Sequence, residues 1–166
     1  LLARKIARNK GEYLKQFLEM VGARLSQAKK FASLADSAAK LEVALGMVGK
    51  TATELAVGLG QDPTYAMLHA TPFLELFGHV ATSHYLMDAA VVAQESLDKI
   101  AQREGATDEA AIAKLVKDND EAAFYHGRVA SARYFVANVL PHAQAIATAA
   151  ASGDHSPLDI RFPEEA

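Results

Sequence analysis

Apolar residues recur at steps of three and four along most of the chain, which is the spacing of one face of an α-helix. A single apolar stripe follows this spacing in residues 12–30, and a second runs without a break through residues 34–59. The second stripe alternates steps of four and three, the heptad pattern of helices packed in a bundle. Ser33 is the predicted N-cap of this helix, and Gly58 and Gly60 are expected to end it.

The next helical region has two start signals. Asp62-Pro63 is an N-cap followed by proline at the first helical position, and Thr71-Pro72 repeats that signal. Proline inside a helix kinks or breaks it. The sequence therefore predicts either a short helix followed by a long one that ends near Arg103, or one helix kinked at Pro72.

A last helical region is expected to begin after Thr107, a predicted N-cap with acidic residues in the following turn. Asn119-Asp120 is expected to break this region, and Pro141 to kink it before it continues to about Ala151. The short alternating segments typical of strands are absent from the sequence. The pattern predicts an all-α fold, an up-down bundle of four main helices that are long and partly kinked.

Composition is consistent with one globular domain, since 51% of the 166 residues are hydrophobic and 22% are charged. The bundle is expected to span residues 1–158, with a tail over residues 159–166. The chain has no cysteine, which excludes disulfides, thiolate metal sites and a cysteine nucleophile. A net charge of −3, with no apolar run of about 18 residues, predicts neither a nucleic-acid nor a membrane partner. A cytoplasmic location is expected.

Charge is distributed unevenly along the chain. Residues 1–30 carry eight lysines or arginines and two glutamates. A solvent-exposed helix face explains this bias, because a phosphate or nucleic-acid site would add aromatic or glycine-rich partners, which are sparse here. The start "LLARKIARNKG" resembles the middle of a helix, so the chain is expected to be part of something longer.

The stretch "FLELFGHVATSHYLMDAA" combines two histidines with two carboxylates, residue types that bind metals. At 100° per residue they form two pairs on opposite helix faces, Glu75 with His79 and His84 with Asp88. One helix cannot bring both pairs to one ion, and the Glu-x-x-His spacing of di-metal bundles does not occur. The sequence predicts no metal site. We expect His84 to be a core histidine bonded to Asp88 or a backbone carbonyl, and Glu75 and His79 to be a surface or interface pair.

Other catalytic motifs are also absent from the sequence. It contains no glycine-rich phosphate loop and no Gly-x-Ser-x-Gly elbow. The remaining histidines share no register; they are His69, His126, His142 and His155. The segment "FYHGRVASARYF" places Tyr125, Arg128 and Arg133 near aromatic residues. These arginines are expected to extend from a core helix into solvent, and the alternative is an anchor for a neighbouring domain or a phosphate-bearing ligand.

Two stretches together, "FLELFGHV" and "FYHGRVASARYFVANVLP", resemble the C-terminal extension of the longer branch of acyl-CoA dehydrogenases, which includes 3-methylmercaptopropionyl-CoA dehydrogenases. The likeness runs in order over residues 1–158, and Arg128 stands where lysine is common in the family. The positions that match the first family pattern are Phe73, Leu74, Leu76, Phe77, Gly78, His79 and Val80. Those that match the second are Phe124, Tyr125, Ala132, Arg133, Phe135, Leu140 and Pro141.

The resemblance implies a parent enzyme of fatty acid metabolism that uses FAD to remove the α and β hydrogens of an acyl-CoA and passes electrons to a further acceptor. It places the catalytic glutamate upstream of Leu1, so no catalytic residue is assigned within this chain, and no cofactor is expected in it. The expected role is a structural bundle that supports the catalytic body and a homo-oligomer interface. The alternative is a stand-alone helical protein-interaction module without enzymatic activity.

Overall fold

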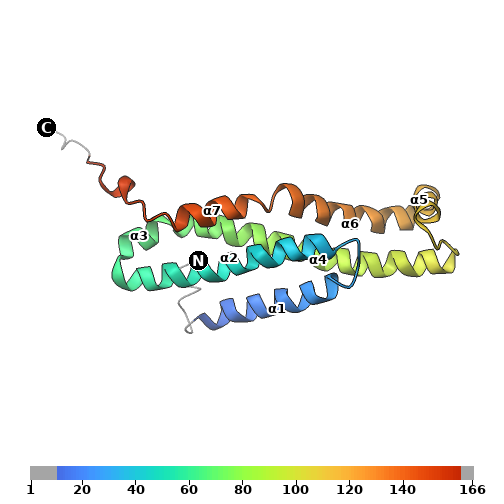
Figure 1. The fold of residues 1–166 in the computed structure, drawn as a ribbon, viewed down its shortest axis with the longest axis horizontal. Coiled ribbons are helices and arrows are strands. Elements are labelled where there is room, and N and C mark those ends of the chain that lie inside the picture. The colour runs from blue at the N-terminus through green and yellow to red at the C-terminus, as the bar shows by residue number, and fades with distance from the viewer. Residues whose placement is uncertain (1–10, 162–166) are drawn as a thin grey trace.

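The computed structural model describes residues 11–161, and within that range all regular secondary structure is helical (Figure 1). This confirms the predicted all-α fold class. The elements are α1 (Glu12–Ala28), α2 (Ala35–Gln61), α3 (Pro63–Leu68), α4 (Ala70–Arg103), α5 (Glu109–Asp118), α6 (Asp120–Asn138), α7 (His142–Ala150) and the short 3-10 helix η3 (Ser156–Leu158). The predicted continuation from residues 1–10 lies outside the described residues.

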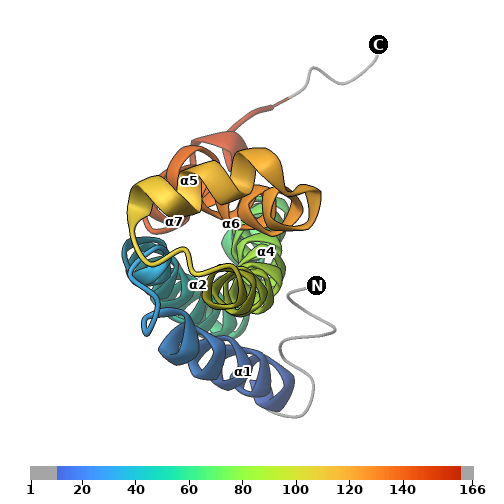
Figure 2. The same cartoon turned by 90° about the vertical axis from the view of Figure 1, so that its right-hand side faces the viewer.

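Four long rods run alternately up and down, with α6 and α7 together forming the fourth (Figure 1). Helices α2 and α4 lie in the middle. Helix α1 packs against both from one side, and α6 and α7 pack against both from the other (Figure 2). The structure therefore confirms the predicted up-down, bundle-like arrangement.

The main core lies between these rods. Phe73, Val80, Met87 and Val91 of α4 are fully buried, and His84 on the same face is 5% exposed, as the helical angles predict. Helix α4 extends beyond α1 and α2 (Figure 1), and there α6 packs on it, while Leu115 and Val116 of α5 pack against the apolar residues at that end. A second, smaller cluster at that end contains Leu97, Ile100 and Ala122.

Several helix limits match the sequence predictions. Asp62 caps α3 by accepting a hydrogen bond from the backbone N–H of Tyr65 at 3.0 Å, and Pro63 follows at the first helical position. A short helix then precedes the long one, the first of the two predicted alternatives. Asn119 separates α5 from α6, and its side chain accepts from the N–H of Ala122 at 2.9 Å.

Two predicted N-cap residues, Ser33 and Thr107, were wrong. Ser33 does not cap α2, which begins at Ala35, because its hydroxyl donates to Gln94 Oε1 of α4 at 2.6 Å. The cap of α5 is not Thr107 but Asp108, whose carboxylate accepts from the N–H of Ala111 at 2.8 Å.

The remaining differences involve glycine and proline. Helix α4 begins at Ala70, so Thr71 lies in its first turn and not at its cap. Helix α2 continues past both predicted terminal glycines to Gln61. Pro141 lies in a break between α6 and α7, not at a kink inside one helix. No helix within residues 11–161 is both long and apolar enough to cross a bilayer.

Candidate functional site

The histidine and carboxylate predicted to pair on α4 lie where α1 packs against this helix. Asp88 forms an ion pair with Arg24 of α1, and Arg24 Nη1 also donates to Gln27 Oε1 at 2.7 Å. The carboxylate is thus engaged by a guanidinium, and His84 Nδ1 is buried without a hydrogen-bond partner. The predicted hydrogen bond from His84 to Asp88 or a backbone carbonyl was therefore wrong, although the predicted burial was right.

The environment of His84 favours an uncharged ring. Burial is the main cause that lowers the pKa of His84 below its usual value; nearby Asp88 opposes this shift and Arg24 adds to it. Two aromatic rings lie beside the imidazole, with Phe17 edge-on at 6.2 Å and Tyr85 at 5.2 Å between ring centroids. Burial and the direction of this shift favour the uncharged ring, and the side chain packs in the interior beside an open pocket that it lines together with Arg24 and Asp88.

The second predicted pair also does not form in the described structure. Among residues 11–161, Glu75 and His79 share no hydrogen bond or ion pair. The ring of His79 instead lies 6.1 Å from that of His142, at the start of α7. No group of three or more His, Cys, Asp or Glu side chains in the described part of the chain could hold a metal ion.

Ser83 on α4 is fully buried, and its hydroxyl has no hydrogen-bond partner, so its substitution tests the packing of the core around α4. An unsatisfied buried polar group costs about 1–3 kcal/mol, and alanine is the better helix former. We expect Ser83→Ala to raise the free energy of unfolding by about 1–2 kcal/mol, measured by urea denaturation. Ser131→Ala is the control, because that exposed hydroxyl donates to Gly127 O, and it should change stability by less than about 0.5 kcal/mol. A destabilised Ser83→Ala would show that the hydroxyl has a partner.

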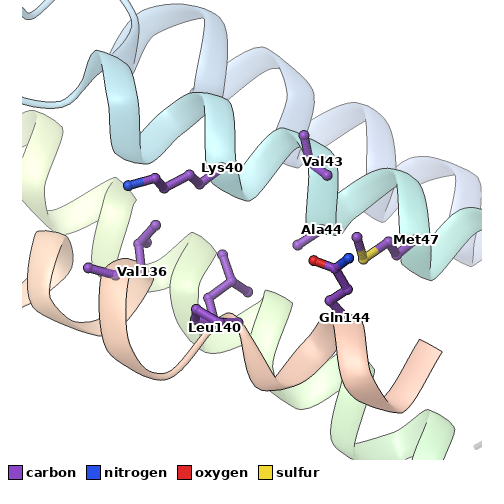
Figure 3. A pocket seen from close by; sticks show the side chains of 9 residues that line it. Lys40, Val43, Ala44, Met47, Val136, Leu140 and Gln144 are labelled. Carbon is purple, nitrogen blue, oxygen red and sulfur yellow. The ribbon is translucent and has the colours of Figure 1, made fainter. Parts of the chain in front are cut away.

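An open apolar groove runs between α2 and the α6–α7 rod (Figure 3). Its first section has a volume of about 290 Å³, and further sections of about 460 Å³ and 320 Å³ continue it. The first two sections share Met47 and Gln144, and the second and third share Glu54 and Ala151. The side chains labelled in Figure 3 are Lys40, Val43, Ala44, Met47, Val136, Leu140 and Gln144.

Charges on the rim of the groove are neutralised within α2. Lys40 pairs with Asp36 at 2.8 Å, and Lys50 pairs with Glu54 at 3.8 Å. The walls of the first section are mainly aliphatic, and Val43 is 62% exposed in them. Such a surface is suited to contact with apolar protein surface and not to binding a highly charged group. The sequence did not predict this groove, because the α2 residues that line its first section lie outside the heptad stripe.

The arginines of α6 are exposed, as expected. The guanidinium carbon of Arg128 lies 5.4 Å from the centroid of the exposed Phe124 ring, a cation–π contact, and Arg133 is also exposed. An anchoring role for them stays a prediction.

The fold brings His155 and Asp62 into contact, although no prediction from the sequence connected them. His155 Nε2 lies 2.8 Å from Asp62 Oδ2, although 93 positions separate them. Neither residue belongs to a motif or a shared helical register, so spacing along the chain gives no signal for this contact.

The geometry so far defines the class of protein, an all-helical bundle with a long open groove. Within residues 11–161, the histidines and carboxylates of this bundle do not assemble a metal site. The chain belongs to the family described as Acetyl-CoA dehydrogenase C-terminal like, whose model matches residues 13–161. This confirms the resemblance carried by the two motifs.

Two relatives support the same assignment. The chain is 27% identical to butyryl-CoA dehydrogenase of Syntrophomonas wolfei over 163 residues, which cover 98% of this chain and 24% of that protein. It is 33% identical to 3-methylmercaptopropionyl-CoA dehydrogenase of Ruegeria pomeroyi over 100 residues, which cover 60% of this chain and 17% of that protein. The chain thus spans about a quarter or less of the length of these relatives.

Proposed function

We propose that this chain is the C-terminal part of an FAD-dependent acyl-CoA dehydrogenase, which removes the α and β hydrogens of an acyl-CoA thioester. The family match over residues 13–161 carries this proposal, and both relatives are named as dehydrogenases of acyl-CoA compounds. Acyl-CoA as substrate, an electron-transfer acceptor as partner and a cytoplasmic location belong to the same proposal.

The residues of this chain do not fit a flavin site. A cofactor pocket encloses most of its ligand and places a few polar groups against it. The groove is open along its length, the walls of its first section are mainly aliphatic, and its lysines pair with carboxylates of their own helix. We therefore derive no catalytic step through a flavin here, and propose that FAD is held by the rest of the protein.

The environments of the Asp and Glu side chains also bear on whether this chain holds the catalytic base. A base that removes an α-proton works best with its pKa raised towards the working pH, usually by burial. No Asp or Glu side chain in residues 11–161 is buried. Hydrogen bonds from the backbone N–H groups of Tyr65 and Ser156 are the largest causes that lower the pKa of Asp62 and Asp154. This supports a catalytic glutamate upstream of Leu1 and no catalytic residue here.

The role we propose for this chain is structural. The bundle, predicted over residues 1–158 and followed by a tail over residues 159–166, supports the catalytic body and takes part in a homo-oligomer interface. The apolar groove between α2 and the α6–α7 rod supports this role, because such surface is usually covered by protein. The same groove also favours the alternative, a stand-alone module that binds other proteins without catalysis.

A comparison of two expressed chains tests the proposal. The 166-residue chain should bind no flavin and oxidise no acyl-CoA, whereas a chain that also includes the upstream coding sequence should do both with butyryl-CoA or 3-methylmercaptopropionyl-CoA and an artificial electron acceptor. The measurements are flavin absorbance, dye reduction and sedimentation. As a matched control, Glu→Gln at the glutamate predicted upstream of Leu1 should keep the flavin and lose turnover. Turnover by the 166-residue chain, or an inactive flavin-free longer chain, would overturn the assignment.

A further inference from the structure

Residues 153–158, called the strap from here on, follow α7 and pass beside α3 at one end of the bundle (Figure 1). Gly153 begins the strap with a φ of 73°, a left-handed conformation that glycine adopts readily. His155 then connects the strap to the bundle. Its Nε2 lies 2.8 Å from Asp62 Oδ2, and its Nδ1 lies 2.8 Å from the carbonyl oxygen of Gly153.

Both partners of the His155 ring are hydrogen-bond acceptors. A carbonyl oxygen accepts only, and an ionised carboxylate accepts only. A neutral imidazole carries one N–H and can donate to only one of them, whereas the charged ring carries two N–H groups and can donate to both. The observed geometry therefore matches the doubly protonated ring, and loss of one proton removes one of the two bonds.

Tyr65 completes a network that includes both flanking helices. Its ring stacks on His155 with 4.5 Å between centroids and 25° between planes, an arrangement that favours a cationic imidazole. Its hydroxyl accepts from the N–H of Gly153 at 2.9 Å and donates to the carbonyl of Ala150 at 3.2 Å. Since Asp62 Oδ1 also caps α3, the start of α3, the end of α7 and the strap share one set of bonds.

The charges around His155 favour its protonation. Asp62 faces it from the start of α3 and Asp154 from the strap itself. Glu54 of α2 lines the same pocket, but its carboxylate pairs with Lys50. Tyr65 and the buried His69, whose rings lie 4.6 Å apart, are the other titratable groups on this side. The hydrogen bond to Asp62, followed by that to the Gly153 carbonyl, raises the pKa of His155.

We propose that residues 153–158 form a pH-sensitive strap, which the doubly protonated His155 ring fastens to Asp62 and which loosens when that ring loses a proton. The third section of the apolar groove, about 320 Å³, is lined by Leu55, Val57 and Gly58 on one side and by Gly153 and His155 of the strap on the other. Loosening therefore opens this end of the groove. The inference does not depend on the proposed dehydrogenase activity.

The direction of the pH dependence follows from the pKa shifts of His155 and Asp62. Because the pKa of His155 is raised on folding, its contribution is fully present below the ordinary histidine value of about 6.5 and is lost as pH rises through the raised value. The pKa of Asp62 is lowered by the Tyr65 N–H and by His155, so its contribution is lost only as pH falls below about 3.8. The strap is held best between these two limits and loosens on the alkaline side first.

Nuclear magnetic resonance of the 166-residue chain tests the proposal. The imidazole titration of His155 is followed in the wild type and in Asp62→Asn, which keeps an oxygen to cap α3 but removes the charge. The midpoint for His155 should shift down in the variant. Exchange protection of the Gly153 amide is measured in parallel and corrected for the intrinsic pH dependence of exchange. In the wild type this protection should be lost as pH rises through the His155 midpoint. In His155→Gln it should not change over the same pH range.

His126→Gln is the matched control, since His126 is an exposed histidine on α6, and the Gly153 transition should be unchanged in that variant. Amide protection of buried α4 residues reports that each variant remains folded. An unchanged His155 midpoint in Asp62→Asn, or Gly153 protection that does not vary across the wild-type midpoint, would overturn the strap.

Discussion

Phe73→Ala is expected to lower the free energy of unfolding by about 3–5 kcal/mol, the largest effect of any single truncation that we predict. Phe73 lies in the first turns of α4, is fully buried and is the bulkiest of the fully buried side chains. Its truncation loses the transfer energy of the ring and leaves a cavity in the main core, which the surrounding helices can only partly close. Urea denaturation at equilibrium measures the change as a lower midpoint.

Leu74→Ala is the matched control for this experiment. Leu74 follows Phe73 on the same helix but is 52% exposed, so its truncation should cost less than about 1 kcal/mol. The two substitutions differ mainly in the helix face that they modify. Equal losses for both would contradict the orientation of α4 in which one face holds the core.

The orientation of α4 is predictable because it depends on local periodicity. A helical repeat of 3.6 residues places Phe73, Val80, Met87 and Val91 on one side, and the structure buries all four. Capping by Asp62 is predictable for a similar reason, since its side chain bonds an N–H only three residues away. Asn119, predicted only as a break, bonds the N–H of Ala122 in the same way.

Tertiary partners explain the predictions that were wrong. The hydroxyl of Ser33 is suited to a cap, but Gln94, 61 positions away, accepts its hydrogen bond instead. Asp88 is four residues from His84 and suited to pair with it, but Arg24 of α1 forms an ion pair with that carboxylate. Local spacing indicates which bonds are available, and the packing of helices distant in sequence decides which of them form.

The groove and the strap are tertiary features for the same reason. Residues of α2 outside the heptad stripe, Val43 among them, line the groove only because α6 and α7 lie beside them. His155 meets Asp62 only because the up-down order returns the end of α7 to the start of α3. The family resemblance gave no indication of the strap. Leu140 and Pro141 of its second motif line the first section of the groove, but the motif alone does not show that α2 lies opposite them.

Ala132→Leu gives the second large effect, an expected loss of about 1–3 kcal/mol in the free energy of unfolding. Ala132 is fully buried on α6, the helix that packs along α4, where Ala90 and Ala93 are also buried. Small side chains allow the two helices to approach closely, so added methylenes must displace neighbours or adopt strained rotamers. Ala132 is also one of the positions that carry the family resemblance, and close packing against α4 gives a physical reason for alanine there.

Ala130→Leu is the control for this substitution, because Ala130 is exposed two residues earlier on the same helix. It adds the same volume on a face directed to solvent and should change stability by less than about 0.5 kcal/mol. Thermal unfolding followed by circular dichroism compares the two variants with the wild type. If Ala132→Leu unfolds at the same temperature as Ala130→Leu, α6 does not pack on α4 through the face that holds Ala132, and the motif alanine requires another explanation.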